Sequence, residues 1–346
     1  MNFDLIDTPQ AFDGLASEWN ALLSDSVTDV PFLRHEYLRA WWASLGGGEW
    51  PAAELQIVTG RDSSGRLVGL APLMRLTVGE EPTLHFIGSF EISDYLDLLV
   101  RADDAQAFVG GLLAMLAGAP AGAWRALDLY NLRAVSPILP LVLQAAGERG
   151  WQATEEPLQP CPVIALPGDW ESYLQSLEKK QRHELRRKLR RADGHASPVA
   201  LRWVDDPEQL EPSMQAFLRL MRLDPAKSRF LTEAMEMHFR RLAVEARHGN
   251  WLRLAFLEVG GDPAAGYLFF DYGNRLWIYN SCLNPAFSEL SPGWVLTGRM
   301  IQWAIEHGRS AFDFLRGGED YKFRLGGVAE TISRVRVERQ PGPTAG

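Results

Sequence analysis

The stretch that decides the fold is residues 266–326, which opens GYLFFDYGNRLWIYNSCLN (266–284) and closes SAFDFLRGGEDYKFRLG (310–326). Aromatic and β-branched residues on both sides of Gly273-Asn274 predict a β-hairpin. The apolar positions that follow recur at helical spacing, through Val295, Leu296, Met300, Trp303 and Ile305. A strand, a helix and a further strand predict a parallel pair of strands, and such sheets bind ligands at the carboxyl ends of their strands.

The same residues resemble a known family. The segment Phe312–Gly326, with Leu290–Gly293 before it, resembles the C-terminal signature of the CelD-like acetyltransferases, and Lys179–Arg191 resembles the family's other mark. These proteins are a branch of the GNAT superfamily close to the FemAB-type peptidyl transferases. The resemblance covers residues 160–330 firmly and the first half loosely. It implies a GNAT-like fold and acyl transfer to an amine, and it supplies no substrate.

Length and composition bound the class of protein. A chain of 346 residues, 46 % hydrophobic and 23 % charged, predicts a globular protein of two domains or of one large domain. The N-terminus is acidic where a signal peptide would be basic, and no apolar run approaches the roughly 20 residues that span a bilayer. We therefore expect a cytoplasmic protein with no membrane span. The two cysteines and seven histidines lack metal-ligand spacing, so we expect no metal site. No pattern indicates an oligomeric state.

The predicted elements of the second half repeat those of the first. Two hairpin strands and one later strand occur in each half, at 55–60, 66–74 and 127–130 and again at 252–259, 265–271 and 312–315. A long repeat with drifting spacing predicts two diverged copies of one fold, although any α/β protein alternates in a similar way. We predict a mixed α/β protein of two tandem GNAT-like domains. The second is expected to be catalytic, because the first has no counterpart of Arg316–Lys322.

The domain boundary is predicted in a proline-rich connector, Glu155–Pro162, which could not continue a helix. The N-terminal domain would span residues 1–156 and the C-terminal domain residues 157–340. The end of the chain, PGPTAG, predicts a disordered tail at 341–346.

A basic helix is predicted near the start of the second domain. Residues 178–191 contain eight basic and two acidic side chains, a net +6, whereas the rest of a chain of net charge −9 carries −15. One interpretation is a solvated face whose arginines pair with the protein's own acids. The other is that Arg182, Arg186 and Lys188 or their neighbours hold the phosphates of a coenzyme, a nucleotide-sugar or an anionic glycan. Tethered tRNA is the lesser possibility here.

The resemblance places the acyl donor at the start of the helix after the hairpin. In GNAT proteins backbone N–H groups at this point hold a pyrophosphate, and the helix dipole favours the anion. The corresponding residues here are Leu290, Ser291, Gly293 and Trp294. This loop departs from the glycine-rich family pattern, since it has one glycine and a proline that donates nothing. Acetyl-CoA or another acyl-CoA is the implied donor, and an acyl carrier protein or an aminoacyl-tRNA stays open.

Residues at strand ends are the candidates for the chemistry. Acyl transfer to an amine needs a base for the amine proton and an acid for the departing thiolate. The candidate catalytic residues are Tyr279, Asp313, Glu319 and Tyr321, and Arg316 and Lys322 would steer an anionic substrate. For each there is a plainer alternative: Tyr279 is a core tyrosine, Asp313 is paired with an arginine, and the Arg316–Arg324 loop is a surface turn with internal ion pairs.

Three hypotheses follow. The first is an N-acyltransferase that uses an acyl-CoA to modify a primary amine of a sugar or another small molecule, in polysaccharide biosynthesis by analogy with the CelD-like family. The second is a FemAB-type peptidyl transferase that uses aminoacyl-tRNA. The third is a non-catalytic module that binds an anionic polymer through the basic helix.

Overall fold

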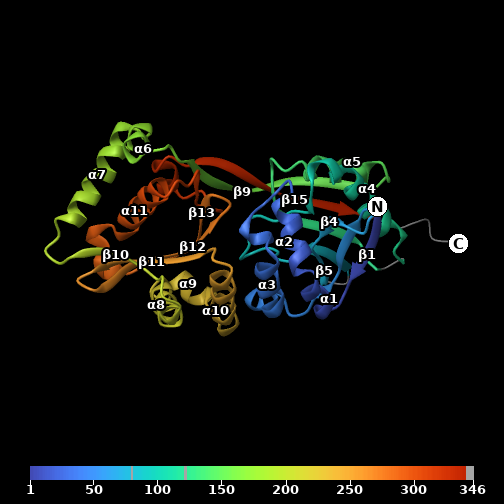
Figure 1. The fold of residues 1–346 in the computed structure, drawn as a ribbon, viewed down its shortest axis with the longest axis horizontal. Helices are drawn as coiled ribbons and strands as arrows, with labels where there is room; N and C mark the ends of the chain where they lie inside the picture. The colour runs from blue at the N-terminus through green and yellow to red at the C-terminus, as the bar shows by residue number, and fades with distance from the viewer. Residues whose placement is uncertain (79–80, 121–122, 340–346) are drawn as a thin grey trace. The chain divides into compact units, whose positions relative to one another are not determined.

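The computed structural model describes residues 1–78, 81–120 and 123–339, which form two compact units (Figure 1). Residues 1–159 and the chain from Thr331 make up the N-terminal unit, and residues 160–330 make up the C-terminal unit. Two long strands, β9 (Gln152–Ala165) and β15 (Val328–Glu338), run from one unit into the other. None of the helices in the described part of the chain is long and apolar enough to cross a membrane.

The N-terminal unit contains two sheets. One has the order β1-β3-β4-β7, from β1 (Asn2–Ile6), β3 (Ile57–Arg61), β4 (Leu67–Ala71) and β7 (Leu99–Val100). The other has the order β15-β8-β6-β5-β2, with β8 (Ala126–Arg133), β6 (Glu81–Phe86), β5 (Leu73–Val78) and β2 (Glu54–Leu55). Strands β6 and β8 are parallel. The helices of this unit are α1 (Pro9–Gly14), α2 (Ala16–Ser24), α3 (His35–Gly48), α4 (Ala105–Gly118) and α5 (Ile138–Gly147).

The C-terminal unit is built on one sheet of order β10-β11-β12-β13-β14-β9. Its further strands are β10 (Val199–Trp203), β11 (Leu252–Val259), β12 (Asp262–Tyr272), β13 (Arg275–Leu283) and β14 (Ala311–Asp313). Strands β12 and β13 form the predicted hairpin, and Gly273 and Asn274 in its turn both adopt positive φ, which a tight hairpin turn requires. Strands β13 and β14 form the predicted parallel pair.

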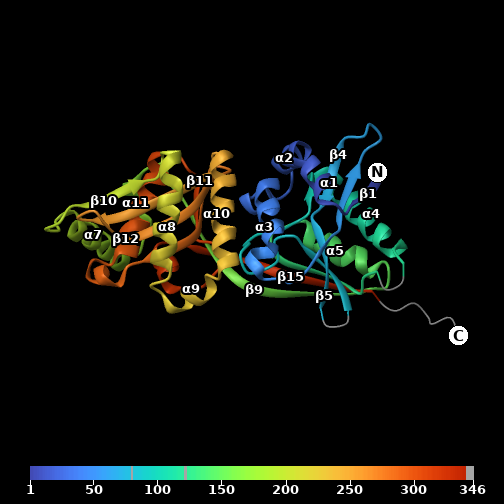
Figure 2. The same ribbon diagram turned by 90° about the horizontal axis from the view of Figure 1, so that it is seen from below.

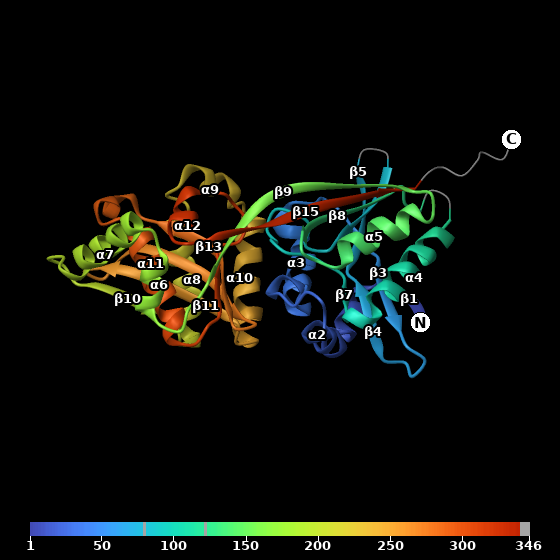
Figure 3. The ribbon, with the colours of Figure 1, turned by 90° about the horizontal axis from the view of Figure 1, so that it is seen from above.

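Helices cover both faces of this sheet. One face is covered by α8 (Leu210–Met221), α9 (Pro225–Phe230) and α10 (Glu233–His248) (Figure 2). The other face carries α6 (Trp170–Ser176), α7 (Lys179–Asp193) and α11 (Pro292–Glu306) (Figure 3). The buried core on that side joins side chains of β11–β14 to those of α6, α7 and α11. A one-turn helix, α12 (Asp320–Arg324), follows β14.

The basic helix lies directly on α11. An apolar stripe on α7, including the buried Leu185, faces α11 at Gly298. A Cβ on Gly298 would lie 2.9 Å from Leu185 Cδ1, so the absence of a side chain lets the two helices approach. The preceding helix, α6, ends at Ser176, and α7 begins at Lys179.

The domain expectations differ from the structure in two respects. The connector Glu155–Pro162 lies inside β9, because prolines are tolerated in a strand where their missing N–H groups are not needed. Residues 331–338 were expected in the C-terminal domain, but they belong to the N-terminal unit because β15 pairs with β8. The boundary lies at 159/160 rather than 156/157. The tail expected at 341–346 lies outside the described residues.

Candidate active site

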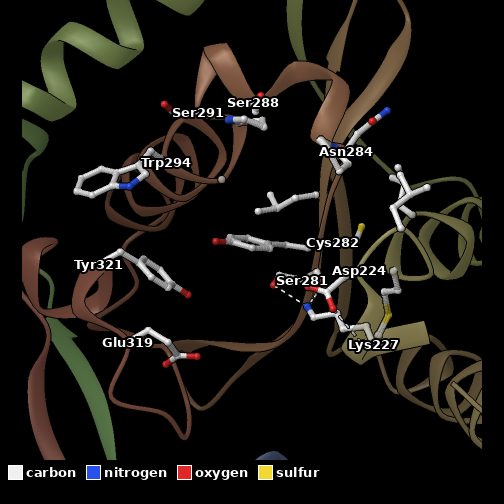
Figure 4. Close-up of a pocket in the computed structure, with 18 of the residues that line it drawn as sticks. Asp224, Lys227, Ser281, Cys282, Asn284, Ser288, Ser291, Trp294, Glu319 and Tyr321 are labelled. Atoms are coloured by element: carbon white, nitrogen blue, oxygen red, sulfur yellow. Dashed lines mark hydrogen bonds between the residues drawn. The ribbon is translucent and has the colours of Figure 1, made fainter. Parts of the chain in front are cut away.

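A cavity of about 690 Å³ lies beyond the point where β13 and β14 separate. The pairing of these two parallel strands ends at Trp277 and Asp313, whereas β13 continues to Leu283. The space is closed by the end of α8 and by the starts of α9, α11 and α12 (Figure 4). Its walls are largely apolar, with Leu220, Met221, Leu223, Leu283 and Trp294 among the lining residues.

Two cations meet at the N-terminus of α11, on the rim of the cavity. Lys188 Nζ and Arg191 of α7 both donate to Ser291 Oγ, at 2.9 and 3.3 Å. Lys188 is 8 % exposed, lies 3.5 Å from Glu184 and stands 5.1 Å from the centre of the Trp294 ring. Among the described residues no side chain caps α11. Pro292 has no N–H, and the N–H of Trp294 donates to the carbonyl of Ser291 at 3.0 Å, so Gly293 supplies the backbone donor at this end of the helix. This N–H, the helix dipole and the two cations together favour an anion.

Two tyrosines lie in the cavity, and their protons are placed differently. Thr297 Oγ1 donates to Gly293 O at 2.7 Å, so its single proton is used there. Tyr267 Oη lies 2.5 Å from the same Thr297 oxygen and must be the donor in that bond. Tyr321 points its hydroxyl into the cavity (Figure 4). Burial, with the charge of Glu319 as a lesser cause, raises the pKa of Tyr321, so this hydroxyl is protonated at neutral pH.

A lysine and a cysteine line the opposite wall. Lys227, on the short helix α9, donates to the carbonyl oxygen of Ser281 and, at 3.3 Å, to Ser281 Oγ. Loss of water around the ammonium lowers the pKa of Lys227, and the negative charges of Asp224 and Glu319 are among the weaker causes that oppose this shift. Burial raises the pKa of the neighbouring Cys282 to about 12. That thiol therefore stays protonated and is a poor nucleophile at neutral pH.

The loop after β14 is held by buried polar groups. Asp313 is fully buried, pairs with Arg275 at 3.2 Å and accepts the N–H of Leu315 at 2.8 Å. Lys322 is 3 % exposed, and its ammonium donates to the carbonyls of Arg316 and Gly317 at 2.7 and 3.2 Å. It also pairs with Glu319 at 2.9 Å. These bonds turn the chain away from β14 and bring Glu319 and Tyr321 to the cavity.

The comparisons with known proteins place this fold. Residues 179–323 match the family profile "Acetyltransferase (GNAT) domain". The C-terminal unit is a GNAT-like domain. The solved structures that resemble the chain include FemX, 13 % identical, with 97 % of both chains covered and a TM-score of 0.67. L-PGS from Bacillus licheniformis is 11 % identical, with 95 % of this chain and 93 % of that chain covered and a TM-score of 0.56.

A third solved structure is the C-terminal domain of a putative lysylphosphatidylglycerol synthetase from Agrobacterium fabrum. It is 13 % identical, covers 96 % of this chain and 92 % of its own, and has a TM-score of 0.54. At these identities the likeness shows the fold alone, which is mixed α/β with GNAT-like folds, as predicted. No curated protein matches the chain. Membership of the CelD-like family is not shown.

The GNAT-like domain brings some of the predicted residues to the cavity. Those that line it are Ser291, Gly293, Trp294, Glu319 and Tyr321. Leu290 is buried beside them, 3 % exposed, and packs with Val259 and Ala264. Asp313 and Lys322 do not line the cavity, and the structure gives both the internal pairing that their plainer alternatives describe.

The other predicted residues lie elsewhere. Tyr279 is 9 % exposed and packs against Phe239 and Phe270, under α10. Arg182 donates to Gln175 Oε1 at 2.8 Å, and Arg186 forms an ion pair with Glu171 at 2.6 Å. None of these, and not Arg316, lines the cavity.

Several lining residues escaped the sequence analysis. Tyr267 carries no signal of its own, because it is one of several aromatic residues in the strand β12. Lys227 lies on α9, and Asp224 caps the start of that helix. Helix α9 has only six residues, too few to show a hydrophobic period. The one available signal was the run Asp224-Pro225, since an aspartate before a proline is a helix-start pattern.

Proposed function

We propose that the chain is an N-acyltransferase whose C-terminal unit is catalytic and takes an acyl-CoA as donor. The observation that carries the proposal is the convergence of Lys188 and Arg191 on Ser291, at an uncapped helix N-terminus that opens into an apolar cavity. The acceptor is a primary amine of a sugar or another small molecule, and polysaccharide biosynthesis is one setting for it. The enzyme would work in the cytoplasm.

The residues at the rim fit a coenzyme phosphate. Pro292 has no N–H, so the loop offers fewer backbone donors than a glycine-rich one. The side chains of Lys188 and Arg191 supply the missing positive charge, because both reach the same neutral oxygen and repel each other there. A phosphate beside Ser291 would relieve this repulsion and accept from both side chains.

The cavity residues supply the proton transfers. The amine nitrogen attacks the thioester carbonyl carbon, so that a C–N bond forms and the C–S bond breaks. Glu319, whose carboxylate faces the cavity, takes the proton that the nitrogen loses (Figure 4). Tyr321 gives its hydroxyl proton to the departing thiolate. Tyr267 cannot do so without releasing Thr297.

Replacement of Arg191 tests the donor site. Arg191 is exposed and has no carboxylate partner among the described residues, so Arg191→Ala should leave the melting temperature unchanged. We expect it to weaken acetyl-CoA and CoA binding about tenfold by titration calorimetry, the loss of one charge-assisted phosphate contact. Arg187→Ala removes an exposed cation of the same helix that does not reach Ser291, and it should bind both as the wild type does. Wild-type protein that binds no acyl-CoA would rule the donor out.

A second function is favoured by the rest of α7. Lys179, Lys180, Arg187 and Arg190 are exposed, and none takes part in an ion pair among the described residues. Such a row of free cations suits a nucleic-acid backbone, and FemX and a putative lysylphosphatidylglycerol synthetase share the fold. The alternative is a FemAB-type transfer from aminoacyl-tRNA. In that case binding of aminoacyl-tRNA would fall steeply with salt, and Arg187→Ala would weaken it as much as Arg191→Ala. A module that binds anionic polymers without catalysis would show neither acyl transfer nor acyl-CoA binding.

A further inference from the structure

The ammonium of Lys227 lies at the cavity wall and donates to two uncharged oxygens. Its two hydrogen bonds both go to Ser281, at the carbonyl and hydroxyl oxygens, and neither acceptor is charged. No described carboxylate forms an ion pair with it. An ammonium has three donors, so one N–H remains for a ligand.

The two nearest acids each already bond to a partner other than the ammonium of Lys227. Asp224 precedes α9 and accepts the N–H groups of Ala226 and Lys227 at 2.8 and 3.1 Å, which fixes its carboxylate at the helix start. Glu319 pairs with Lys322 at 2.9 Å. Lys227 is partly buried, and the loss of water around its ammonium lowers its pKa, so its charge is poorly hydrated. A cation in such a place favours an anion in the space that it faces.

The position of Lys227 tells which substrate would carry that anion. Ser291, which Lys188 and Arg191 contact, lies at one end of the cavity, where the donor phosphate would bind. Lys227 and Ser281 lie away from Ser291, at the lower right of Figure 4, and Tyr321 projects into the cavity from the left. A donor bound at Ser291 therefore places its acyl group in the middle of the cavity and leaves the Lys227 wall to the acceptor.

We infer that the acceptor is an amine that also carries a carboxylate, an amino acid or an acidic amino sugar, and that Lys227 binds this carboxylate. The inference rests on the proposed acyl transfer, since it assigns the second substrate of the same site. It gives Lys227 a specificity role: the ammonium holds the far end of the acceptor and leaves its amine free to reach the carbonyl carbon beside Tyr321.

Paired acceptors test the inference. Acyl transfer from acetyl-CoA is measured with ω-amino carboxylates, from β-alanine to 6-aminohexanoate, and with the alkylamines of the same length that lack the carboxylate. We expect the wild type to prefer the amino carboxylate at least tenfold in kcat/KM, with an optimum at one chain length. In Lys227→Gln the preference should fall to about one, chiefly through KM, with the Kd of acetyl-CoA unchanged.

Two further variants control the experiment. Lys227→Arg keeps a cation and should keep most of the preference. Arg229→Gln removes an exposed cation from the same helix, outside the cavity, and should behave as the wild type. A wild type that shows no preference for the amino carboxylate would overturn the inference. A Lys227→Gln variant that loses turnover equally with both acceptor types would also overturn it, and would assign Lys227 a catalytic or structural role instead.

The inference can fail separately from the proposed function. If no amine is acylated, thermal shift with 4-aminobutyrate and with butylamine still reports carboxylate binding. Stabilisation by 4-aminobutyrate alone, lost in Lys227→Gln, would support the site without acyl transfer. Acyl transfer to all amines with no such stabilisation would support the proposed acyltransferase activity and overturn the carboxylate site.

Discussion

At the scale of single residues, the site is decided by where a few protons lie. Tyr267 and Tyr321 both reach the cavity, but the bond from Thr297 to Gly293 obliges Tyr267 to donate to Thr297. Of these two tyrosines, only Tyr321 then has a proton free for a leaving group. The hydrogen bonds of Lys322 favour a structural role over substrate binding. Its ammonium donates to two backbone carbonyls and pairs with Glu319.

Replacement of each tyrosine by phenylalanine separates the two roles. Tyr321→Phe should lower kcat about 100-fold or more, the usual contribution of a general acid, with the Kd of acetyl-CoA little changed. Tyr267→Phe should lower it less than tenfold, because that hydroxyl serves only to hold Thr297. Steady-state kinetics of both variants beside their melting temperatures is the measurement. Equal losses in the two would contradict the assignment.

At the scale of elements, the contact between α7 and α11 positions the donor site. Lys188 and Arg191 reach Ser291 only because Gly298 lets α7 approach α11 at Leu185. Helix packing and phosphate binding are therefore coupled. The packing of the apolar stripe of α7, including Leu185, on α11 sets how far Lys188 and Arg191 lie from Ser291.

A larger residue at Gly298 should push the helices apart. Gly298→Val forces Leu185 to move and should weaken acyl-CoA binding by tenfold or more, while lowering stability by about 1–3 kcal/mol through overpacking. Gly110 lies in α4 of the other unit, and a Cβ there would contact nothing within 4 Å. Gly110→Ala should leave acyl-CoA binding unchanged and raise stability by about 0.5–1 kcal/mol. Calorimetry and thermal unfolding of both variants report the difference, and unaltered binding by Gly298→Val would show that the two helices are not coupled.

At the scale of the whole molecule, the N-terminal unit holds two buried groups, Asp97 and His85, whose titrations change the stability of the fold in opposite directions. Burial raises the pKa of Asp97 to about 6, although bonds from Ser136, Thr28 and the N–H of Leu98 oppose the shift. Burial lowers the pKa of His85 to about 4. As pH falls from 6 to 4, the folded state takes up a proton at Asp97 and gains stability. Over the same interval the unfolded state takes up a proton at His85, and the folded state loses stability.

The two effects are each about 3 kcal/mol and nearly cancel. His85→Phe removes one of them, so the N-terminal unit of this variant should become more stable by about 2–3 kcal/mol between pH 6 and pH 4. The wild type should change little over the same range, and its small drift should be downward, because burial also lowers the pKa of His35. Hydrogen exchange of the β6 and β8 amides in the full-length protein measures this. A variant that loses stability on acidification would contradict it.

Much of the fold was predictable because its signals are local. The hairpin turn at Gly273-Asn274, the helix from Pro292 and the parallel strand at Ala311 follow from turn chemistry, apolar period and strand propensity, and all three are confirmed. The course of β15 was not predictable in this way. A strand carries no mark of its partner, and the apolar positions of β15 fit β8 in the other unit as well as any closer strand.

The site was predictable in part, and the division has a physical cause. By itself the sequence determined the GNAT-like fold, the helix N-terminus at Ser291–Trp294 and the loop that carries Glu319 and Tyr321, since these depend on residues adjacent in the chain. Only the tertiary structure decided which cation of α7 reaches Ser291, that Arg182 and Arg186 serve internal pairs, and that Lys227 faces the cavity. Lys188 and Ser291 are about 100 residues apart, and Lys227 and Ser281 about 50, so only the packing of distant segments sets these distances. The partners of Arg182 and Arg186 are nearer in the chain, on α6, but the angle at which α6 and α7 pack decides which side chains meet.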